Sequence, residues 1–208
     1  MRKRFLCIVL TLAIMTSLLT VAAPIAGANT FGGTTGNITW SVVIEPGETM
    51  GTLKVGPRTD VSTAAIANYS QGSRAPWFVH SPQVNRIEVL SGITEIGNWA
   101  FADFGNVNNI IVEGNVTRIG NDAFRGCINL VNFWDGNPFA SEPKTFAGLT
   151  AVGANAFDNC VSLVSINMPH VTSVGANAFA GCRNHNITPV AMIVVNYFLY
   201  QFNIFGIS

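Results

Sequence analysis

The sequence predicts a solenoid, a fold in which short units of strand and turn stack along one axis. The first observation is a nine-residue motif that occurs four times, as ITEIGNWAF, VTRIGNDAF, LTAVGANAF and VTSVGANAF at residues 93–101, 116–124, 149–157 and 171–179. The second is its spacing, because the motif glycines are 23, 33 and 22 residues apart. A period near 23 is typical of repeat architectures in which each unit packs only against its neighbours.

An apolar pattern of the form L-x-x-L-x-L precedes each motif and predicts one short strand per unit. Its members are Val84, Ile87 and Val89, then Val107, Ile110 and Val112, then Leu130 and Phe133, then Leu163, Ile166 and Met168. Asp135 is the one position that departs from it. This pattern is typical of the strand half of a leucine-rich repeat.

The second half of each unit carries apolar residues four, five and eight positions after an initial Ile or Val, for example Ile96, Ala100, Phe101 and Phe104. This spacing predicts a short helical turn with one apolar stripe facing the strand. A single unit cannot bury its own apolar face, so the repeated residues must meet in register. We expect Phe124 and Phe157 to fill the space between layers, and the motif glycine to permit a tight backbone path.

The unit I/V-T-x-I/V-G-x-x-A-F-x-x-C-x-x-L-x-x-I resembles the BspA-like (Treponema pallidum type) leucine-rich repeat family of bacterial surface proteins over residues 84–182. The resemblance is carried by Ile119, Gly120, Ala123, Phe124, Cys127, Leu130 and Phe133, and again by Val152, Gly153, Ala156, Phe157, Cys160, Leu163 and Ile166. It implies a leucine-rich-repeat solenoid with a short strand and a helical turn in each repeat, behind a small N-terminal β cap.

The chain divides into four predicted segments. Residues 1–28 are predicted to be a signal peptide, with three early basic residues, an apolar run and small residues before the cut; an uncleaved membrane anchor is the alternative. Residues 29–83 resemble the cap of such repeats, and residues 38–44 and 52–55 predict a β-hairpin around EPGETMG. Residues 84–184 are the repeats, with an insertion rich in Gly and Pro at 135–148.

Residues 185–208 form a divergent hydrophobic tail in which the repeat pattern does not continue. The tail is interpreted as a C-terminal cap, a membrane tail, or the end of a truncated or frame-shifted longer gene. A spanning helix would have to lie within residues 189–207, a stretch that also contains Asn196, Gln201 and Asn203.

Charge and motif content exclude several classes of protein. Removal of the leader leaves eight basic and eleven acidic residues, scattered along the chain, so no nucleic-acid footprint is visible. The sequence contains no G-x-S-x-G, HExxH or P-loop motif, and His80, His170 and His185 are far apart. We therefore expect no enzyme activity, cofactor or metal. A carbohydrate-active enzyme is a weak alternative, because it needs paired carboxylates and only Glu88 is expected on the strand face.

Three cysteines follow the motif phenylalanines at a constant distance of three residues: Cys127, Cys160 and Cys182. The first unit has Phe104 at the same position. A position that accepts either Cys or Phe indicates an apolar packing site. We expect buried free thiols; a disulfide between neighbouring units is the alternative.

Residues between the core positions of each strand must point away from the core. They predict an exposed four-rung face composed of Arg86, Glu88, Asn109, Ile111, Asn132, Trp134, Ser165 and Asn167. Two interpretations of Trp134 stay open: the insertion covers it, or it anchors a partner.

The sequence as a whole favours a secreted or cell-surface, non-enzymatic interaction module, adhesin-like in character. Its predicted partner is a protein or glycan on host or neighbouring cells, bound through the strand face. The membrane would be a partner only if the leader stays uncleaved or the tail inserts. The alternative from another class is a structural spacer that is a fragment of a larger surface protein.

The leader analysis predicts export with cleavage after Ala28. Mass spectrometry of the exported protein should find Asn29 at the N-terminus. Membrane-retained protein that still carries Met1 would support the uncleaved anchor instead.

Overall fold

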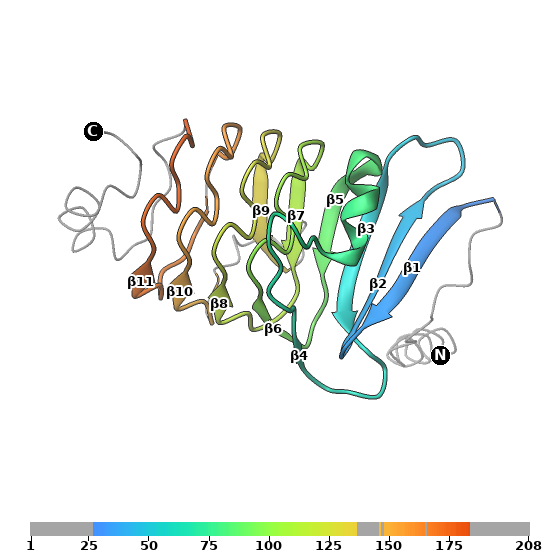
Figure 1. Cartoon of the computed structure of the whole chain (residues 1–208), viewed down its shortest axis with the longest axis horizontal. Helices are drawn as coiled ribbons and strands as arrows, with labels where there is room; N and C mark the ends of the chain where they lie inside the picture. Colours follow the sequence, from blue (N-terminus) through green and yellow to red (C-terminus); the bar gives the residue numbers. More distant parts are fainter. Residues whose placement is uncertain (1–26, 137–145, 147, 165, 184–208) are drawn as a thin grey trace, which may run out of the picture.

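The structure is a computed structural model that describes residues 27–136, 146, 148–164 and 166–183, and the chain folds as an elongated stack on two sheets (Figure 1). In spatial order the six-stranded sheet contains β1 (Asn29–Thr35), β2 (Ile38–Ile44), β3 (Gly51–Pro57), β5 (Val84–Val89), β7 (Asn109–Val112) and β9 (Asn132–Asp135). The five-stranded sheet contains β11 (Ser173–Val174), β10 (Ala151–Val152), β8 (Arg118–Ile119), β6 (Ile93–Ile96) and β4 (Ala64–Ala65).

The N-terminal end of the larger sheet is antiparallel. The predicted hairpin is confirmed, since β2 pairs with β3. Strand β1, which the sequence did not predict, pairs along its whole length with β2. The two are joined by Gly36 and Asn37, and Gly36 has φ +56°, as the first central position of a type II′ hairpin turn requires. The 3-10 helix η1 (Pro76–Gln83) leads into β5.

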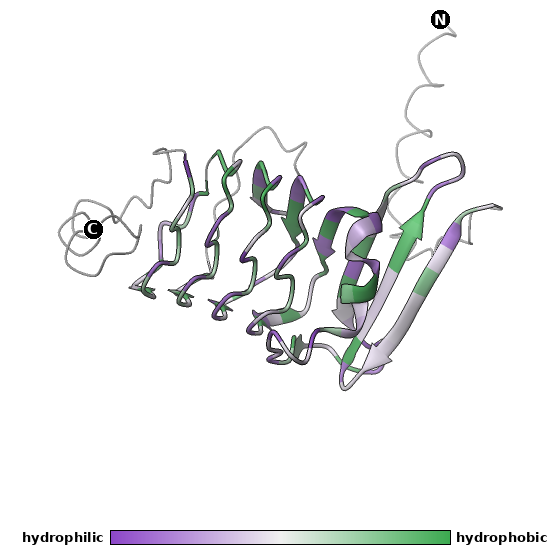
Figure 2. Cartoon of the chain, turned by 45° about the horizontal axis from the view of Figure 1, so that its top comes forward, coloured by the Kyte–Doolittle hydropathy of each residue, from purple (hydrophilic) through white to green (hydrophobic). Residues whose placement is uncertain are grey.

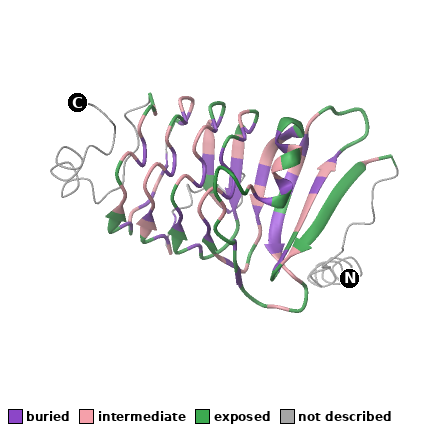
Figure 3. Cartoon of the chain, viewed as in Figure 1, coloured by how far each residue is buried: buried purple, intermediate pink, exposed green. Residues whose placement is uncertain are grey.

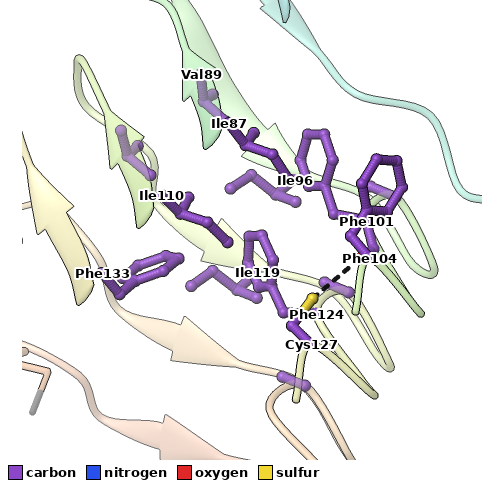
Figure 4. Packing of buried hydrophobic residues seen from close by; sticks show 14 of the residues in the cluster. Ile87, Val89, Ile96, Phe101, Phe104, Ile110, Ile119, Phe124, Cys127 and Phe133 are labelled. Atoms are coloured by element: carbon purple, nitrogen blue, oxygen red, sulfur yellow. Dashed lines mark hydrogen bonds between the residues drawn. The ribbon is translucent and has the colours of Figure 1, made fainter. Parts of the chain in front are cut away.

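From β3 onward the strands of the larger sheet pair in parallel, and β5, β7 and β9 pair in register, so equivalent residues of these units lie side by side. The pairing of β3 with β5 contains one register shift, between Gly51 and Thr52. Beyond that shift side chains alternate between the interior and the outer face, and Ile87 and Val89 of β5 are fully buried, as is Val84 before it. Ile96 and Ile119 of the smaller sheet meet them across the interior, together with the motif phenylalanines (Figure 4).

The expectation of a helical turn in each repeat is wrong, because the described residues form no helix there. Each repeat instead makes a short strand followed by tight turns with two left-handed residues, two and six positions after the motif glycine. These residues are Trp99 and Asp103, Asp122 and Gly126, Asn155 and Asn159, and Asn177 and Gly181. Asp, Asn and Gly tolerate this conformation best. The apolar spacing suggested a helix because it matched a helical period by chance.

The physical reason for these turns is hydrogen bonding between repeats rather than within them. Three backbone N–H groups of one repeat donate to carbonyls of the next at every junction between motifs, for example Asp122 to Ala154 at 2.9 Å and Phe124 to Ala156 at 2.8 Å. A helix would turn the same N–H groups back along its own axis. The turns therefore extend the sheet-like bonding across the whole stack.

The motif phenylalanines form a continuous column of stacked rings in the interior (Figure 4). Centroids of successive rings lie 5.2–5.5 Å apart, with interplanar angles of 5–18°, in the order Phe101, Phe124, Phe157 and Phe179. Trp77 of η1 continues the column at 5.8 Å from Phe101. Phe124 and Phe157 are fully buried, which confirms their predicted interlayer role.

Three further motif positions form ladders. Each threonine hydroxyl donates to a carbonyl of the preceding unit at 3.1–3.3 Å, in the order Thr94, Thr117, Thr150 and Thr172. The side chains of Asn68, Asn98 and Asn121 each accept a backbone N–H from the next unit at 2.8–2.9 Å. A Cβ added at Gly120 would lie 2.6 Å from the backbone nitrogen of Asn98, so the motif glycine is needed for the close approach of neighbouring units.

The cap supplies the partners that the first repeat lacks. The indole N–H of Trp77 donates to the carbonyl of Ala100 at 2.8 Å, and the backbone N–H of Tyr69 donates to that of Asn98 at 2.8 Å. Arg74 reaches the carbonyl of Ala102 at 3.5 Å. These donors take the place of a preceding repeat, so the N-terminal end of the stack is closed.

The fourth predicted strand is absent among the described residues, where the larger sheet ends at β9. Leu163, Ile166 and Met168 are nevertheless buried, as the apolar pattern predicted. Phe146, assigned to the insertion loop, is also buried and packs 5.0 Å from Phe133. Its N–H donates to the carbonyl of Asn167 at 3.3 Å, so this residue of the insertion joins the core beside the fourth unit.

Several predictions concern residues outside the described ranges. They are the leader up to residue 26, residues 137–145 and 147 of the insertion, the side chain of Ser165, and the tail from residue 184. Within the described ranges, no helix has the length and apolar character needed to cross a membrane.

Truncation of the aromatic column should be costly. Phe124→Ala is expected to lower the free energy of unfolding by about 3 to 5 kcal/mol, because it removes a fully buried ring stacked on both sides. The control is Ile128→Ala, four residues further along the same unit and 47% exposed. It should change the free energy of unfolding by less than about 0.5 kcal/mol. Thermal melts that fail to separate the two variants would contradict the register of the stack.

Candidate interaction surface

Sheet register places six of the eight predicted site residues on one outer face. Arg86 pairs with Asn109, which pairs with Asn132. Glu88 pairs in the same way with Ile111, which pairs with Trp134. We call this surface the strand face; it comprises the six residues together with Thr52 and Lys54, which pair with Arg86 and Glu88 from β3.

The N-terminal part of the strand face is charged. Glu88 lies between two cations, with its carboxylate oxygens 2.9 Å from the Lys54 Nζ and 2.9 Å from the Arg86 Nε. The side chain of Glu88 is 13% exposed, whereas those of Lys54 and Arg86 are 45% and 37% exposed. The positive groups therefore face solvent more than the carboxylate does. Sequence reasoning missed Lys54, because the pairing of β3 with β5 links residues far apart in the chain.

The central part is a row of amides. The side-chain N–H of Asn132 donates to the Asn109 Oδ1 at 2.8 Å, and that of Asn109 donates to the Asn108 Oδ1 at 2.6 Å. Each amide thus fixes the orientation of the next across two rungs. Such a row presents donors and acceptors at the spacing of the strands.

Trp134 and Ile111 behave differently from each other. Trp134 is 37% exposed. The interpretation in which the insertion covers it concerns residues 137–145 and 147, which lie outside the described ranges. Ile111 was expected to be exposed, and this was wrong: it is only 3% exposed although it points to the outer face and lies outside the main core cluster. Alternation along a strand predicts the side of the sheet on which a residue lies but not whether other parts of the chain cover it.

The fourth predicted rung does not join the strand face. Ser165 lies outside the residues whose side chains are described, and Asn167 lies beyond the end of the sheet. The Oδ1 atom of Asn167 is buried and has no hydrogen-bond partner among the described residues. The predicted four-rung face is thus three rungs deep on the repeats and gains one rung from the cap.

A second polar cluster lies at the turns. The Trp99 ring is flanked by two guanidinium groups, with Cζ of Arg74 4.9 Å and Cζ of Arg125 5.5 Å from its centroid. Arg125 is also 3.3 Å from Asp158 and 3.7 Å from Asp122. Burial raises the pKa of the Asp122 carboxyl more than Arg125 lowers it. The sequence contained one sign of this cluster: Trp99 occupies a position at which the other repeats have Asp or Asn.

A shallow hollow of about 200 Å³ lies along β4, β6 and β8 of the smaller sheet. Glu95, Arg118, Asn68 and Asn98 are among the residues that line it. Asn68 and Asn98 already accept backbone hydrogen bonds within their ladder. Glu95 and Arg118 are therefore the charged residues that the hollow offers to a ligand.

The three cysteines are free thiols that form a column beside the phenylalanines; Cys127 and Cys160 are buried as expected, whereas Cys182 is only partly buried. Each Sγ lies 3.2–3.3 Å from a phenylalanine carbonyl of the preceding repeat, Cys127 to Phe101, Cys160 to Phe124 and Cys182 to Phe157 (Figure 4). Burial raises the pKa of Cys127 to about 12 and that of Cys182 to about 12, and it raises that of Cys160 well above its ordinary value. The thiols are therefore neutral donors at physiological pH, the opposite of what a nucleophile requires.

Other candidate ligands are dispersed. Within the described ranges, no three His, Cys, Asp or Glu side chains are grouped so as to hold a metal ion. His80 is half-buried and stacks on Phe31 with centroids 4.6 Å apart. Its ring also lies 5.8 Å from Trp40, so it belongs to an aromatic group of the cap.

Comparison with known proteins identifies the repeats. The model of the BspA type leucine-rich repeat region, in six copies, matches residues 74–186 and 137–203. The two ranges together cover more than half of the chain, and they extend past residue 184, where the repeats were predicted to end. No curated protein matches the chain.

Several solved bacterial structures are similar. A leucine-rich repeat protein from Eubacterium ventriosum is 21% identical, with 76% of this chain and 43% of that protein covered and a TM-score of 0.49. A leucine rich cell surface protein from Faecalibacterium prausnitzii is 18% identical, with 76% and 54% covered and a TM-score of 0.31. The T. pallidum leucine rich repeat protein is 16% identical, with 80% and 96% covered and a TM-score of 0.30. The chain spans less than half of the Eubacterium ventriosum protein.

The thiol column predicts a clear difference between folded and unfolded protein. At pH 8 the folded chain should react very slowly with a thiol reagent, because burial keeps the thiols protonated and covered. Under denaturing, non-reducing conditions three thiols should react in the processed chain, and two in a Cys127→Ala variant. A single reactive thiol after unfolding of the parent would reveal a disulfide and contradict the arrangement.

Proposed function

We propose that this chain, which belongs to the BspA-type leucine-rich repeat family, is a non-catalytic recognition module that binds a protein partner through its strand face. The observation that carries the proposal is Trp134, a large aromatic side chain 37% exposed at the end of a polar and charged face. Exposed aromatics of this kind contribute most of the binding energy in many protein interfaces.

The rest of the strand face supports the same role. The amides of Asn109 and Asn132 are already oriented by hydrogen bonds, so a partner would lose little entropy in ordering them. Lys54 and Arg86 present exposed positive charge next to the amides. A partner of matching chemistry would bring an apolar pocket for Trp134 and acidic groups near the two cations.

We further propose that the module acts outside the cell. The support is the predicted leader at residues 1–28, with its early basic residues, apolar run and small residues before the cut. As part of a longer polypeptide, the same stack would instead act as a spacer, and the binding test below separates these roles.

Replacement of Trp134 should weaken partner binding. Trp134→Ala is expected to reduce affinity about thirtyfold, or roughly 2 kcal/mol, because it removes the largest exposed apolar side chain of the strand face. Binding is measured by surface plasmon resonance against immobilised host extracellular-matrix proteins and, in parallel, against their released glycans.

The control is Thr59→Ala, an exposed residue of the cap that lies off the strand face, and circular dichroism checks the fold of both variants. Equal binding by the two variants would remove Trp134 from the site. Binding to the glycan channel alone would identify a glycan as the partner. No binding by the parent in either channel would favour the spacer role.

A further inference from the structure

Strand β1 is an edge strand that has almost no contact with the interior. Six of its seven residues are exposed, and Figure 3 shows exposure along the whole strand. Residues on both of its sides are exposed, including Phe31, which lies opposite the buried Val42. Apart from its ladder with β2, the main ring contact of β1 is the stack of Phe31 on His80. A strand that buries so little contributes little to the stability of its own fold.

The outer edge of β1 offers a regular set of backbone groups. The two-residue turn at Gly36 and Asn37 is closed by a hydrogen-bonded pair, Thr35 and Ile38. Hydrogen-bonded and non-hydrogen-bonded pairs alternate along an antiparallel ladder. The N–H and C=O groups of Thr30, Gly32 and Thr34 therefore point away from β2, toward the open edge.

These three residues are arranged so that the edge complements itself. A two-fold axis perpendicular to the sheet and midway between the Gly32 residues of the two copies places Gly32 opposite Gly32 and Thr30 of one copy opposite Thr34 of the other. All three outward-facing residues then fall in hydrogen-bonded pairs, which gives about six backbone bonds across the axis. We propose that β1 pairs antiparallel with β1 of a second copy of this chain, in this register.

The side chains on the inner side fit the same register. Phe31 of one copy lies opposite Gly33 of the other, and the reverse pair repeats it. An aromatic ring opposite a glycine covers backbone that the glycine leaves bare, a pairing known to strengthen strands. The half-exposed ring of Phe31 would thus be covered on the side that His80 leaves open.

The strand lacks the features by which proteins protect free edges. It contains no charged residue, no proline and no bulge in its pairing with β2. Its hydropathy is intermediate along most of its length (Figure 2). Absence of charge means that no like charges meet across the axis. Cleavage after Ala28 would also make β1 the first segment of the processed chain, so no preceding segment would obstruct the edge.

Pairing of this kind would join the two larger sheets into one continuous sheet. Because the axis is perpendicular to the sheet, both strand faces would point to the same side. Two copies of the face would then be available to one extended partner, and binding to both would raise the avidity.

The test uses the exported, processed chain in sedimentation equilibrium at about 100 µM, since small interfaces are weak. The parent should sediment at twice the monomer mass. Thr30→Lys with Thr34→Lys should sediment as a monomer, because two pairs of lysines then face each other across the axis. Thr30→Lys with Thr34→Glu should restore the dimer, because each lysine then faces a glutamate of the other copy.

The matched control adds the same two charges elsewhere, as Thr39→Lys on β2 with Thr59→Lys in the cap, both at exposed positions, and it should remain dimeric. Circular dichroism confirms that the variants are folded. A monomeric parent would overturn the proposal and leave the edge to an extended peptide of another protein. A dimer that survives the double lysine variant, or a lysine–glutamate variant that stays monomeric, would overturn it as well.

Discussion

Backbone hydrogen bonding between adjacent repeats is the constraint on which the rest of the structure depends. Each repeat directs N–H groups of its turns toward carbonyls of the next, and it can do so only with left-handed residues at two places, such as Asp122 and Gly126. Any unit is therefore incomplete without its neighbour. The four copies of the motif have nearly the same sequence for this reason, because each residue must contact its counterpart in the next repeat.

The motif residues divide the work of satisfying that constraint. Threonine hydroxyls donate to backbone carbonyls of the preceding unit, and asparagine side-chain oxygens accept backbone N–H groups of the next unit. The cysteine thiols donate to the phenylalanine carbonyls. The first repeat carries Phe104 at this position, which has no donor, so the thiol adds a hydrogen bond to what is first an apolar packing site. The first repeat has no preceding repeat to donate to its turn carbonyls, and the side chains of Trp77 and Arg74 donate to them from the cap instead. The interior is thus apolar in content but closed by polar groups at each layer.

The outer surface is free of that constraint, and here the chain has room for function. The strand face combines paired charges, oriented amides and one exposed indole on adjacent rungs. Its residues differ from unit to unit, as Glu88, Ile111 and Trp134 do in one register position. The edge strand β1 extends the same sheet in the other direction. Recognition and self-association would therefore use one surface and its border, while the interior keeps the register.

By itself the sequence determined the repeat length, the buried positions and the interlayer role of Phe124 and Phe157, because these depend on periodicity within one unit and its copies. It also predicted which strand residues point outward, including Trp134. Only the tertiary structure decided that the turns are left-handed rather than helical, since the choice rests on carbonyls of the next repeat. The same holds for Lys54 beside Glu88 and for Phe146 beside Phe133, because each contact depends on partners distant in the chain, which no local pattern encodes.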